Sequence, residues 1–276
     1  MIELPEARTL AAQIRAELAG KRIQSVIAMQ SPHKFAFFRG DPQEVPIRMQ
    51  GEIITGASAH GGIVELETEN LRLGFFDGVR FRLLAAGETR PPKHQLLLEF
   101  DDGRALAMSV QMYGAFLLFG RNEPADDGFH TGAHSKPSPL SDAFDAAYFD
   151  GLWNATPEKY SVKAFLATEQ RIPGLGNGVL QDILWHAKIH PKTKLSALDG
   201  AAKQRLFQSV KSTLAAMTQG GGRDTEKDLF GNAGGYRTIL SNKTLTFPCP
   251  ACGAGLVRTA YLGGNIYFCP GCQNAL

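Results

Sequence analysis

Gln170-Arg-Ile-Pro-Gly-Leu-Gly-Asn-Gly178, continued by Val179-Leu-Gln-Asp-Ile-Leu-Trp-His-Ala-Lys-Ile-His-Pro191, decides the fold of the second half of this chain. It predicts two helices joined by a tight turn, because glycine allows backbone segments to approach closely. Gly176, Asn177 and the free N–H groups at the next helix start form a seat for a phosphate. Lys163, one helix earlier, would add a positive charge to that phosphate. The stretch is therefore a candidate for contact with a nucleic-acid backbone, but taken alone it is more typical of a turn that only breaks a helix.

The residues around this junction predict a helical domain from 142 to 240. Apolar residues recur at helical spacing between 142 and 219. Residues 122–141 lack such a period and are rich in proline, glycine and aspartate, which indicates a linker. After the helices, Gly220-Gly-Gly222 opens a glycine-rich stretch that we expect to be flexible.

Residues 1–121 predict a separate domain of one helix and a β-sandwich. Apolar residues follow Pro5 at helical spacing until Gly20, which indicates a helix from about 5 to 19 with one buried face. Short apolar or alternating segments separated by turns then follow, which favours an antiparallel sandwich or barrel. The clearest strand candidates are 62–68, 80–84, 95–100 and 115–119.

All four cysteines lie near the end of the chain, in two Cys-x2-Cys pairs: Cys249 with Cys252, and Cys269 with Cys272. This spacing is typical of a zinc ribbon, in which each pair directs two thiolates at one tetrahedral Zn2+. The strand-like runs around Gly263-Gly264 predict a β-hairpin. We expect one structural zinc ion in a ribbon from 241 to 276, with no open coordination position for chemistry.

The composition is that of a globular protein with a mild positive charge. The chain has 276 residues, of which 43% are hydrophobic and 20% charged, and its formal net charge is +2. This length predicts two domains with a small appendage, and the charge permits a nucleic-acid partner without demanding one. The sequence contains no apolar run of about 18 residues and no signal-peptide pattern at its start. We therefore expect a cytoplasmic monomer, nucleoid-associated if bacterial, with no membrane partner.

Three motifs together closely resemble the formamidopyrimidine-DNA glycosylase and endonuclease VIII family. They are Glu3-Leu-Pro-Glu6, the segment from Gly174-Leu-Gly-Asn177 to Ile189-His-Pro191, and the terminal Phe-Cys-Pro-Gly-Cys-Gln273. The resemblance covers most of the chain. It implies an N-terminal helix on a β-sandwich, a helix-two-turns-helix domain and a zinc finger, with damaged or bent duplex DNA in the cleft between the halves. This is the α+β multidomain architecture that the residue pattern also predicts.

The N-terminus departs from the family pattern. Members of the family attack the sugar C1′ with the secondary amine of an N-terminal proline, which is exposed when the initiator methionine is removed. Ile2 stands at the matching position, and removal of the methionine normally needs a small second residue, so we expect Met1 to remain. A retained Met1 amine is still a possible Schiff-base nucleophile.

Glu3 and Glu6 match the two acidic residues of the family motif. The resemblance implies that they handle proton transfers around the sugar and the base, a task for carboxylates held close together and partly desolvated. The alternative is that both only stabilise the positive N-terminal end of the first helix.

The resemblance also implies altered DNA contacts. Ala59-His-Gly-Gly62 replaces an Arg-Gly-Lys hairpin tip, so His60 is either a partial substitute for the lysine or a solvated turn residue. Gly264 stands where the family's finger carries an arginine. Lys93-His94 weakly resembles a motif near DNA phosphates.

Other altered positions are those that fill the gap left by a flipped base. They become Met112 and Tyr113 in Gln111-Met-Tyr-Gly114, and Phe75 in Gly74-Phe-Phe-Asp-Gly78. An apolar or aromatic side chain can plug the emptied stack, although packing in the sandwich core would require the same residue types. The acidic stretch from Arg223 to Asn232 stands at the family's lesion-capping loop and would suit either a base edge or a protein partner.

These features favour a DNA-repair enzyme that excises damaged bases. Because both carboxylates remain and the imine-forming proline is absent, we expect hydrolysis, with Glu3 activating water and lyase activity weak or lost. The main alternative is a non-catalytic protein of the same fold that recognises DNA lesions. A bifunctional lyase that uses the N-terminal amine is a third hypothesis.

Overall fold

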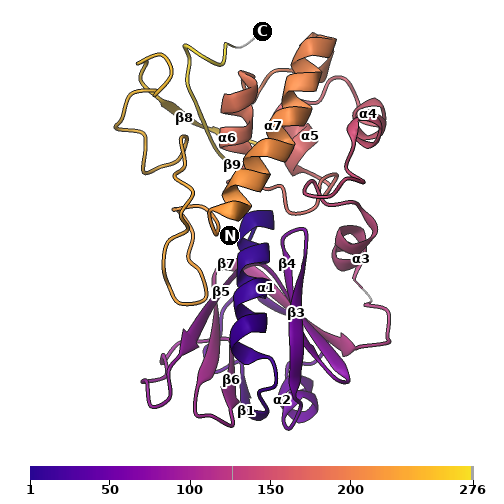
Figure 1. Ribbon diagram of the computed structural model, residues 1–276, viewed down its shortest axis with the longest axis vertical. Coiled ribbons are helices and arrows are strands. Elements are labelled where there is room, and N and C mark those ends of the chain that lie inside the picture. The colour runs from indigo at the N-terminus through magenta and orange to yellow at the C-terminus, as the bar shows by residue number, and fades with distance from the viewer. Residues whose placement is uncertain (126, 275–276) are drawn as a thin grey trace.

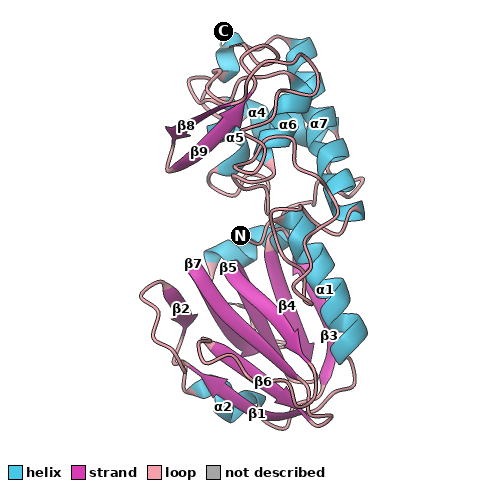
Figure 2. Cartoon of the chain, turned by 90° about the vertical axis from the view of Figure 1, so that its left-hand side faces the viewer, coloured by secondary structure: helices cyan, strands magenta, loops and turns pink. Residues whose placement is uncertain are grey.

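The chain folds into two halves stacked along the long axis of the molecule (Figure 1). The computed structural model describes residues 1–125 and 127–274. Residue 126 of the predicted linker and residues 275–276 of the predicted zinc ribbon lie outside this description. One half contains helix α1 and the large sheet, and the other contains the remaining long helices and the two-stranded ribbon (Figure 2).

Helix α1 (Leu4–Leu18) confirms the first helix predicted from the sequence. Pro5 stands in its first turn, and the carboxylate of Glu6 accepts a hydrogen bond from the backbone N–H of Glu3 at 3.3 Å, as in a capping box. One face of the helix is buried against the sheet by residues that share its helical spacing: Leu4, Ala7, Leu10, Ala11, Ile14 and Leu18. The start of α1 points at the other half of the molecule (Figure 1).

The strands form one connected seven-stranded sheet in the order β1-β6-β7-β5-β4-β3, with β2 added to β7. Their bounds are β1 Ile23–Ala28, β2 Ala36–Arg39, β3 Ile54–His60, β4 Ile63–Thr68, β5 Leu71–Leu84, β6 Leu96–Phe100 and β7 Ala105–Gly120. The four strand candidates from the sequence all lie in these strands. The sequence favoured purely antiparallel pairing, but β2 pairs with β7 in parallel.

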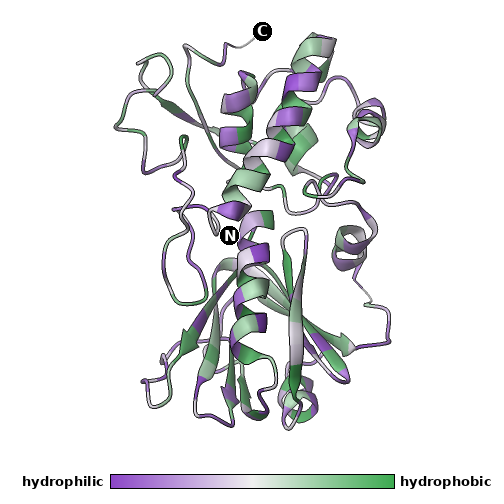
Figure 3. Ribbon diagram, viewed as in Figure 1, coloured by the Kyte–Doolittle hydropathy of each residue, from purple (hydrophilic) through white to green (hydrophobic). Residues whose placement is uncertain are grey.

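The long strands β5 and β7 connect the two ends of this sheet. Their register shifts between Asp77 and Val79, and such an irregularity bends a strand. The curved sheet encloses a core of alternating apolar residues; Figure 3 shows hydrophobic and hydrophilic positions alternating along the strands. Helix α2 (Glu44–Met49) packs beside β1 at the far end.

Helix α3 (Gly128–Ser135) lies in the segment that the sequence predicted as a linker. The Asp127 carboxylate caps it by accepting hydrogen bonds from the N–H groups of Phe129 and His130. His130 and Ala133 form its buried face. A buried histidine takes the place of an apolar residue, which is why no hydrophobic period marks this helix.

The second half contains α4 (Ala146–Asn154), α5 (Val162–Ala167), α6 (Leu180–Ala187), the short 3-10 helix η1 (Leu195–Ala197) and α7 (Gly200–Gln219). These helices share a separate apolar core and confirm the helical pattern predicted between 142 and 219. The strands β8 (Val257–Tyr261) and β9 (Gly264–Phe268) form the predicted hairpin. Among the described residues, no helix is both long and apolar enough to cross a membrane.

Candidate active site

The Glu3 side chain lies at the junction of the two halves, at the start of α1. It is 3% exposed, and its carboxylate accepts hydrogen bonds from the N–H groups of Gly178 at 2.8 Å and Val179 at 2.7 Å. Burial raises the pKa of Glu3 above its ordinary value, although the Arg223 charge opposes the shift. The N–H groups that the sequence offered to a phosphate at the start of α6 are therefore bound to a carboxylate of the same chain.

Arg223 connects this carboxylate to Glu6. Its backbone N–H, Nε and Nη2 donate to the Glu6 carboxylate at 3.0, 2.9 and 2.9 Å, and its Nη1 lies 3.4 Å from Glu3 Oε2. All three side chains are buried. Burial opposes the charged form of Arg223, but the two carboxylates raise its pKa above the usual range. The sequence did not assign Arg223 a role, and we call these three residues the carboxylate–arginine cluster.

The glycines of the junction make room for this cluster. A Cβ atom on Gly176 would lie 2.5 Å from Glu3 Oε1, and one on Gly178 would lie 1.6 Å from Arg223 Nη1. Gly174 has a φ of +77°, and a Cβ there would lie 2.4 Å from the backbone of Gly61 in the β3–β4 turn. Each of the three glycines is thus required by a different close contact: Gly174 with Gly61, Gly176 with Glu3 and Gly178 with Arg223.

Ile2 lies beside the cluster, with its side chain in the sandwich core. Its nitrogen is a peptide nitrogen that donates to the carbonyl oxygen of Asp77 at 2.7 Å. The Met1 amine forms an ion pair with Glu226 at 2.7 Å. The nitrogen at the family's nucleophile position is therefore an amide, and the free amine stands one residue away from it.

A cavity of about 490 Å3 opens beside Met1 and Glu6. It lies between β5, β7 and the loop at 223–235, and Lys93 and His94 also line it. His94 is 4% exposed and its Nδ1 is paired with the Pro91 carbonyl, but its Nε2 is buried without a hydrogen-bond partner among the described residues. The His94 ring therefore lines the cavity, but its Nε2 atom is shielded.

The loop at 223–235, which the sequence predicted to be flexible, is docked on the first half. Leu229 is fully buried in the core of the sheet, and its carbonyl accepts from Leu83 N–H at 2.9 Å. Gln13 of α1 exchanges hydrogen bonds with Leu229 and Asp228. Arg82 donates to the Phe230 carbonyl at 2.8 Å. The loop closes over the 490 Å3 cavity from the side of α1.

The predicted plug residues separate into exposed and buried positions. Met112 and Tyr113 are 65% and 41% exposed, and the Tyr113 hydroxyl lies 3.9 Å from Met1 Sδ. Phe75 is fully buried and packs edge-on against Phe81 and Phe116 in the core. Of the three, only Met112 and Tyr113 are exposed, so only they keep the position at the surface that the predicted role requires.

The predicted phosphate-contact residues gather where the junction meets the ribbon tip. Lys163 is buried and donates to the Tyr261 carbonyl at 2.5 Å, and burial lowers its pKa. Asn177 donates to the Asn265 carbonyl at 2.9 Å. A Cβ on Gly264 would lie 3.3 Å from Asn177 Nδ2. Glycine in place of the family's arginine lets the ribbon approach Asn177 this closely.

The four cysteine sulfurs form one cluster. Their Sγ atoms all lie within 4.8 Å of one another, at 3.7 Å for Cys249 and Cys272 and 3.4 Å for Cys252 and Cys269. None forms a disulfide. Thiolates around a tetrahedral Zn2+ at about 2.3 Å from the metal would be about 3.8 Å apart, so the sulfur positions fit a metal ion. Gln273 fixes the cluster to the helical half by donating to the Ile189 carbonyl at 3.0 Å.

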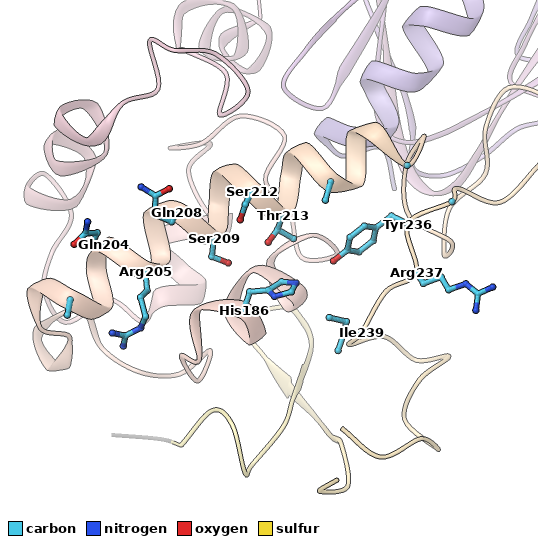
Figure 4. A pocket seen from close by; sticks show the side chains of 14 residues that line it. His186, Gln204, Arg205, Gln208, Ser209, Ser212, Thr213, Tyr236, Arg237 and Ile239 are labelled. Atoms are coloured by element: carbon cyan, nitrogen blue, oxygen red, sulfur yellow. The ribbon is translucent and has the colours of Figure 1, made fainter. Parts of the chain in front are cut away.

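A larger groove of about 1170 Å3 lies away from the carboxylate–arginine cluster, between α6, α7 and the segment after the loop. Figure 4 shows His186, Ser209, Thr213, Tyr236 and Ile239 facing one another across it. This groove is the larger of the two, but neither Glu3 nor Glu6 lines it, whereas Glu6 lines the 490 Å3 cavity. We therefore place the candidate active site at the 490 Å3 cavity.

These features are the ones expected of DNA glycosylases with a helix-two-turns-helix: two halves joined at buried carboxylates, a helical junction beside a four-cysteine ribbon, and a loop-covered cavity. The profile described as "Formamidopyrimidine-DNA glycosylase N-terminal domain" matches residues 1–149, and the one described as "Formamidopyrimidine-DNA glycosylase H2TH domain" matches residues 136–227. The chain belongs to the formamidopyrimidine-DNA glycosylase family, which confirms the resemblance predicted from the sequence.

Individual relatives cover nearly the whole chain at low identity. The formamidopyrimidine-DNA glycosylase of Streptococcus pyogenes is 26% identical over 279 residues, covering 99% of this chain and 98% of its own. That of Legionella pneumophila is 28% identical over 282 residues, with the same coverage. Among solved structures, Lactococcus lactis Fpg with abasic-site DNA has a TM-score of 0.82 at 23% identity, and Thermus thermophilus MutM (Fpg) has 0.81 at 24%. Each of these two structures covers 99% of both chains, which shows the shared fold.

Proposed function

We propose that this protein binds damaged duplex DNA as a monomer in the cytoplasm and excises a damaged base by hydrolysis of its N-glycosidic bond. The observation that carries the proposal is the carboxylate–arginine cluster beside the loop-covered cavity. It keeps Glu3 and Glu6 within one buried ion network, and it does so at the junction between the halves. A desolvated carboxylate with a raised pKa is suited to proton transfer near neutral pH.

The chemistry would proceed without an imine. The Ile2 nitrogen carries no free lone pair, because it is an amide that donates to the Asp77 carbonyl. Glu3 would accept a proton from a water molecule as the water oxygen bonds to C1′, the bond between C1′ and the base nitrogen would break, and the proton taken from water would pass to the departing base. Because no covalent intermediate forms on the protein, strand cleavage would be weak or absent.

The surroundings of the cavity support the entry of a flipped base. The volume of about 490 Å3 is within the range of small-molecule sites, and Glu6, Lys93 and His94 place polar side chains in its lining. Tyr113, with Met112, would fill the gap in the stack. Asn177, Gly176 and Lys163 would position the backbone, with the Lys163 charge acting from beneath the ribbon tip.

We also propose that Cys249, Cys252, Cys269 and Cys272 hold one Zn2+. The ion would stabilise a ribbon that has almost no apolar core of its own. With four thiolate ligands it has no open position for chemistry. Removing the metal is therefore expected to release the ribbon tip from Asn177 and weaken DNA binding without altering the carboxylate–arginine cluster.

The experiment compares base release with covalent trapping. The purified protein is incubated with duplexes containing an oxidised purine, an oxidised pyrimidine or an abasic site, with and without borohydride. We expect free base from at least one duplex and no protein–DNA adduct, and intact mass should show Met1 retained. An adduct would instead indicate that the N-terminal amine forms an imine.

Matched variants separate chemistry from folding. Glu3→Gln keeps the size and one of the two acceptor oxygens but removes the charge, and it should abolish base release. Glu17→Gln lies near the other end of the same helix, at an ion pair with the half-buried Arg104, and should leave base release unchanged. Thermal denaturation of both variants checks that a loss of activity is not a loss of fold.

A second candidate function is supported by the saturation of Glu3. Its two oxygens are taken by Gly178 N–H, Val179 N–H and Arg223, so the carboxylate could serve only to tie the halves together. The protein would then bind lesions without excising them. Preferential binding to lesion duplexes, with neither free base nor adduct from any of them, is the outcome that favours this function.

A further inference from the structure

Three histidines and one glutamate meet on the side of the first half that faces α3. His60 ends β3, Glu65 is in β4, and His130 and His134 are on α3. The two helix residues are four apart and therefore share one face. Both direct Nε2 at the same carboxylate oxygen, Glu65 Oε1, at 2.6 Å from His130 and 2.5 Å from His134.

The carboxylate of Glu65 is buried and incompletely paired. Its residue is 0% exposed, and Oε2 has no hydrogen-bond partner among the described residues. The nearest cation, Arg72, places Nη1 at 3.7 Å, beyond hydrogen-bonding distance. A buried carboxylate oxygen without a partner carries a desolvation cost unless something else binds it.

His60 completes the cluster. Its ring stacks on that of His134 with centroids 3.6 Å apart, so it is not a solvated turn residue. The ligand atoms of His60, Glu65 and His134 all lie within 4.8 Å of one another. Two imidazoles and a carboxylate are the ligands preferred by zinc and its neighbours in the first transition series, whereas magnesium and calcium prefer oxygen alone.

We propose that His60, Glu65 and His134 bind a second divalent transition-metal ion, of the zinc class, separate from the cysteine ribbon. His130 is the positioning residue, because its hydrogen bond to Glu65 orients the carboxylate, as outer-shell partners do in known metal sites. Three protein ligands leave one coordination position open. His60 and His134 line a cavity of about 320 Å3. Its other lining residues include Arg8, Arg15 and Lys136.

The ion would fasten α3 to the β3–β4 hairpin. The tip of that hairpin, Gly61, packs against Pro173 and Gly174 of the helical half. The site therefore joins two segments that are distant in sequence, the β3–β4 hairpin and α3, and metal binding should stabilise the chain. This inference does not depend on the proposed glycosylase activity.

The test measures metal content and stability. The full chain is saturated with zinc chloride, desalted and assayed for zinc per chain by mass spectrometry of the metal. We expect two zinc ions in the wild type, one in the double variant His60→Ala/His134→Ala, and two in the control His33→Ala, whose ring lies outside the cluster. Added zinc should raise the melting temperature of the EDTA-treated wild type more than that of the double variant.

Cobalt binding keeps the proposal falsifiable if the double variant does not fold. Wild-type protein titrated with Co2+ should take up two equivalents, one with thiolate-to-cobalt charge-transfer absorption and one without it. Uptake of a single equivalent that carries all of the thiolate absorption would overturn the proposal, as would two zinc ions retained in a folded double variant.

Discussion

Replacement of Arg223 by Met should destabilise the protein more than the loss of any surface ion pair. The substitution removes two side-chain hydrogen bonds to Glu6, from Nε and Nη2, and the nearest cation to Glu3, while the hydrogen bond from the backbone N–H to Glu6 remains. Both carboxylates stay 5% exposed or less. Breaking a buried pair by removing one partner costs about 3–5 kcal/mol because the other charge is left uncompensated. Arg39→Met, at an ion pair whose arginine side chain is 58% exposed, should cost about 0–1 kcal/mol.

The pH dependence gives this prediction a second arm. Burial already raises the pKa of Glu3 above 4.5, and Arg223 opposes the shift, so its removal should raise this pKa further. A carboxyl group whose pKa is higher in the folded state weakens stability as pH rises from the unfolded to the folded value. The penalty of Arg223→Met should therefore be larger at pH 8 than at pH 5.5.

The assay is urea denaturation at both pH values, followed by tryptophan fluorescence and by circular dichroism. The double variant Arg223→Met/Glu6→Met should cost less than the sum of its single variants, with a coupling of about 0.5–3 kcal/mol. A cost below 1 kcal/mol for Arg223→Met, or the same cost at both pH values, would refute the buried ion network as described here.

Three further variants test neighbouring parts of the structure. Gly178→Ala places a Cβ 1.6 Å from Arg223 Nη1, so it should lower the free energy of unfolding, measured in urea, by about 1–3 kcal/mol. The control is Gly151→Ala in α4, which should not lower it because the space around Gly151 is open. Tyr113→Ala should weaken binding to a duplex with an abasic site by about 5- to 150-fold if the ring stacks in the gap. Fluorescence anisotropy measures the affinity, with Ile47→Ala as the control for loss of an exposed apolar side chain. Equal affinities of the two variants would contradict the plug role. Burial raises the pKa of Asp182 from 3.8 to about 6, so wild-type stability should fall as pH rises through that interval, and Asp182→Asn should flatten this part of the urea stability profile.

The parts of the fold that the sequence predicted are those with local signals. Helix α1 and the strands follow from the period of their apolar residues, and the cysteine spacing alone predicted the sulfur cluster. Helix α3 escaped prediction because its stability depends on Glu65, 65 positions before His130. No period or motif in the sequence connects those two residues.

The candidate site shows the same limit. Glu3 and Glu6 could be identified from their family motif, but their partner Arg223 is an ordinary cation in a glycine-rich stretch, 217 positions from Glu6. The residue types at Phe75 and Tyr113 are equally suited to a plug. Only the direction of each side chain, which depends on the register of β5 with β7, places Phe75 in the core and leaves Tyr113 exposed.

The junction and the loop at 223–235 act together because of the carboxylate–arginine cluster. The alternate glycines of the junction hold Glu3 at the start of α6, while Arg223, the first residue of the loop, binds the same carboxylate from the other side. Release of the loop from Leu83 and Gln13 would therefore move the cation that compensates Glu3. Burial raises the pKa of Glu3 and the Arg223 charge lowers it. Opening and closing of this loop would therefore change the proton affinity of Glu3. Entry of a base and the protonation state of Glu3 would then be coupled through one ion pair.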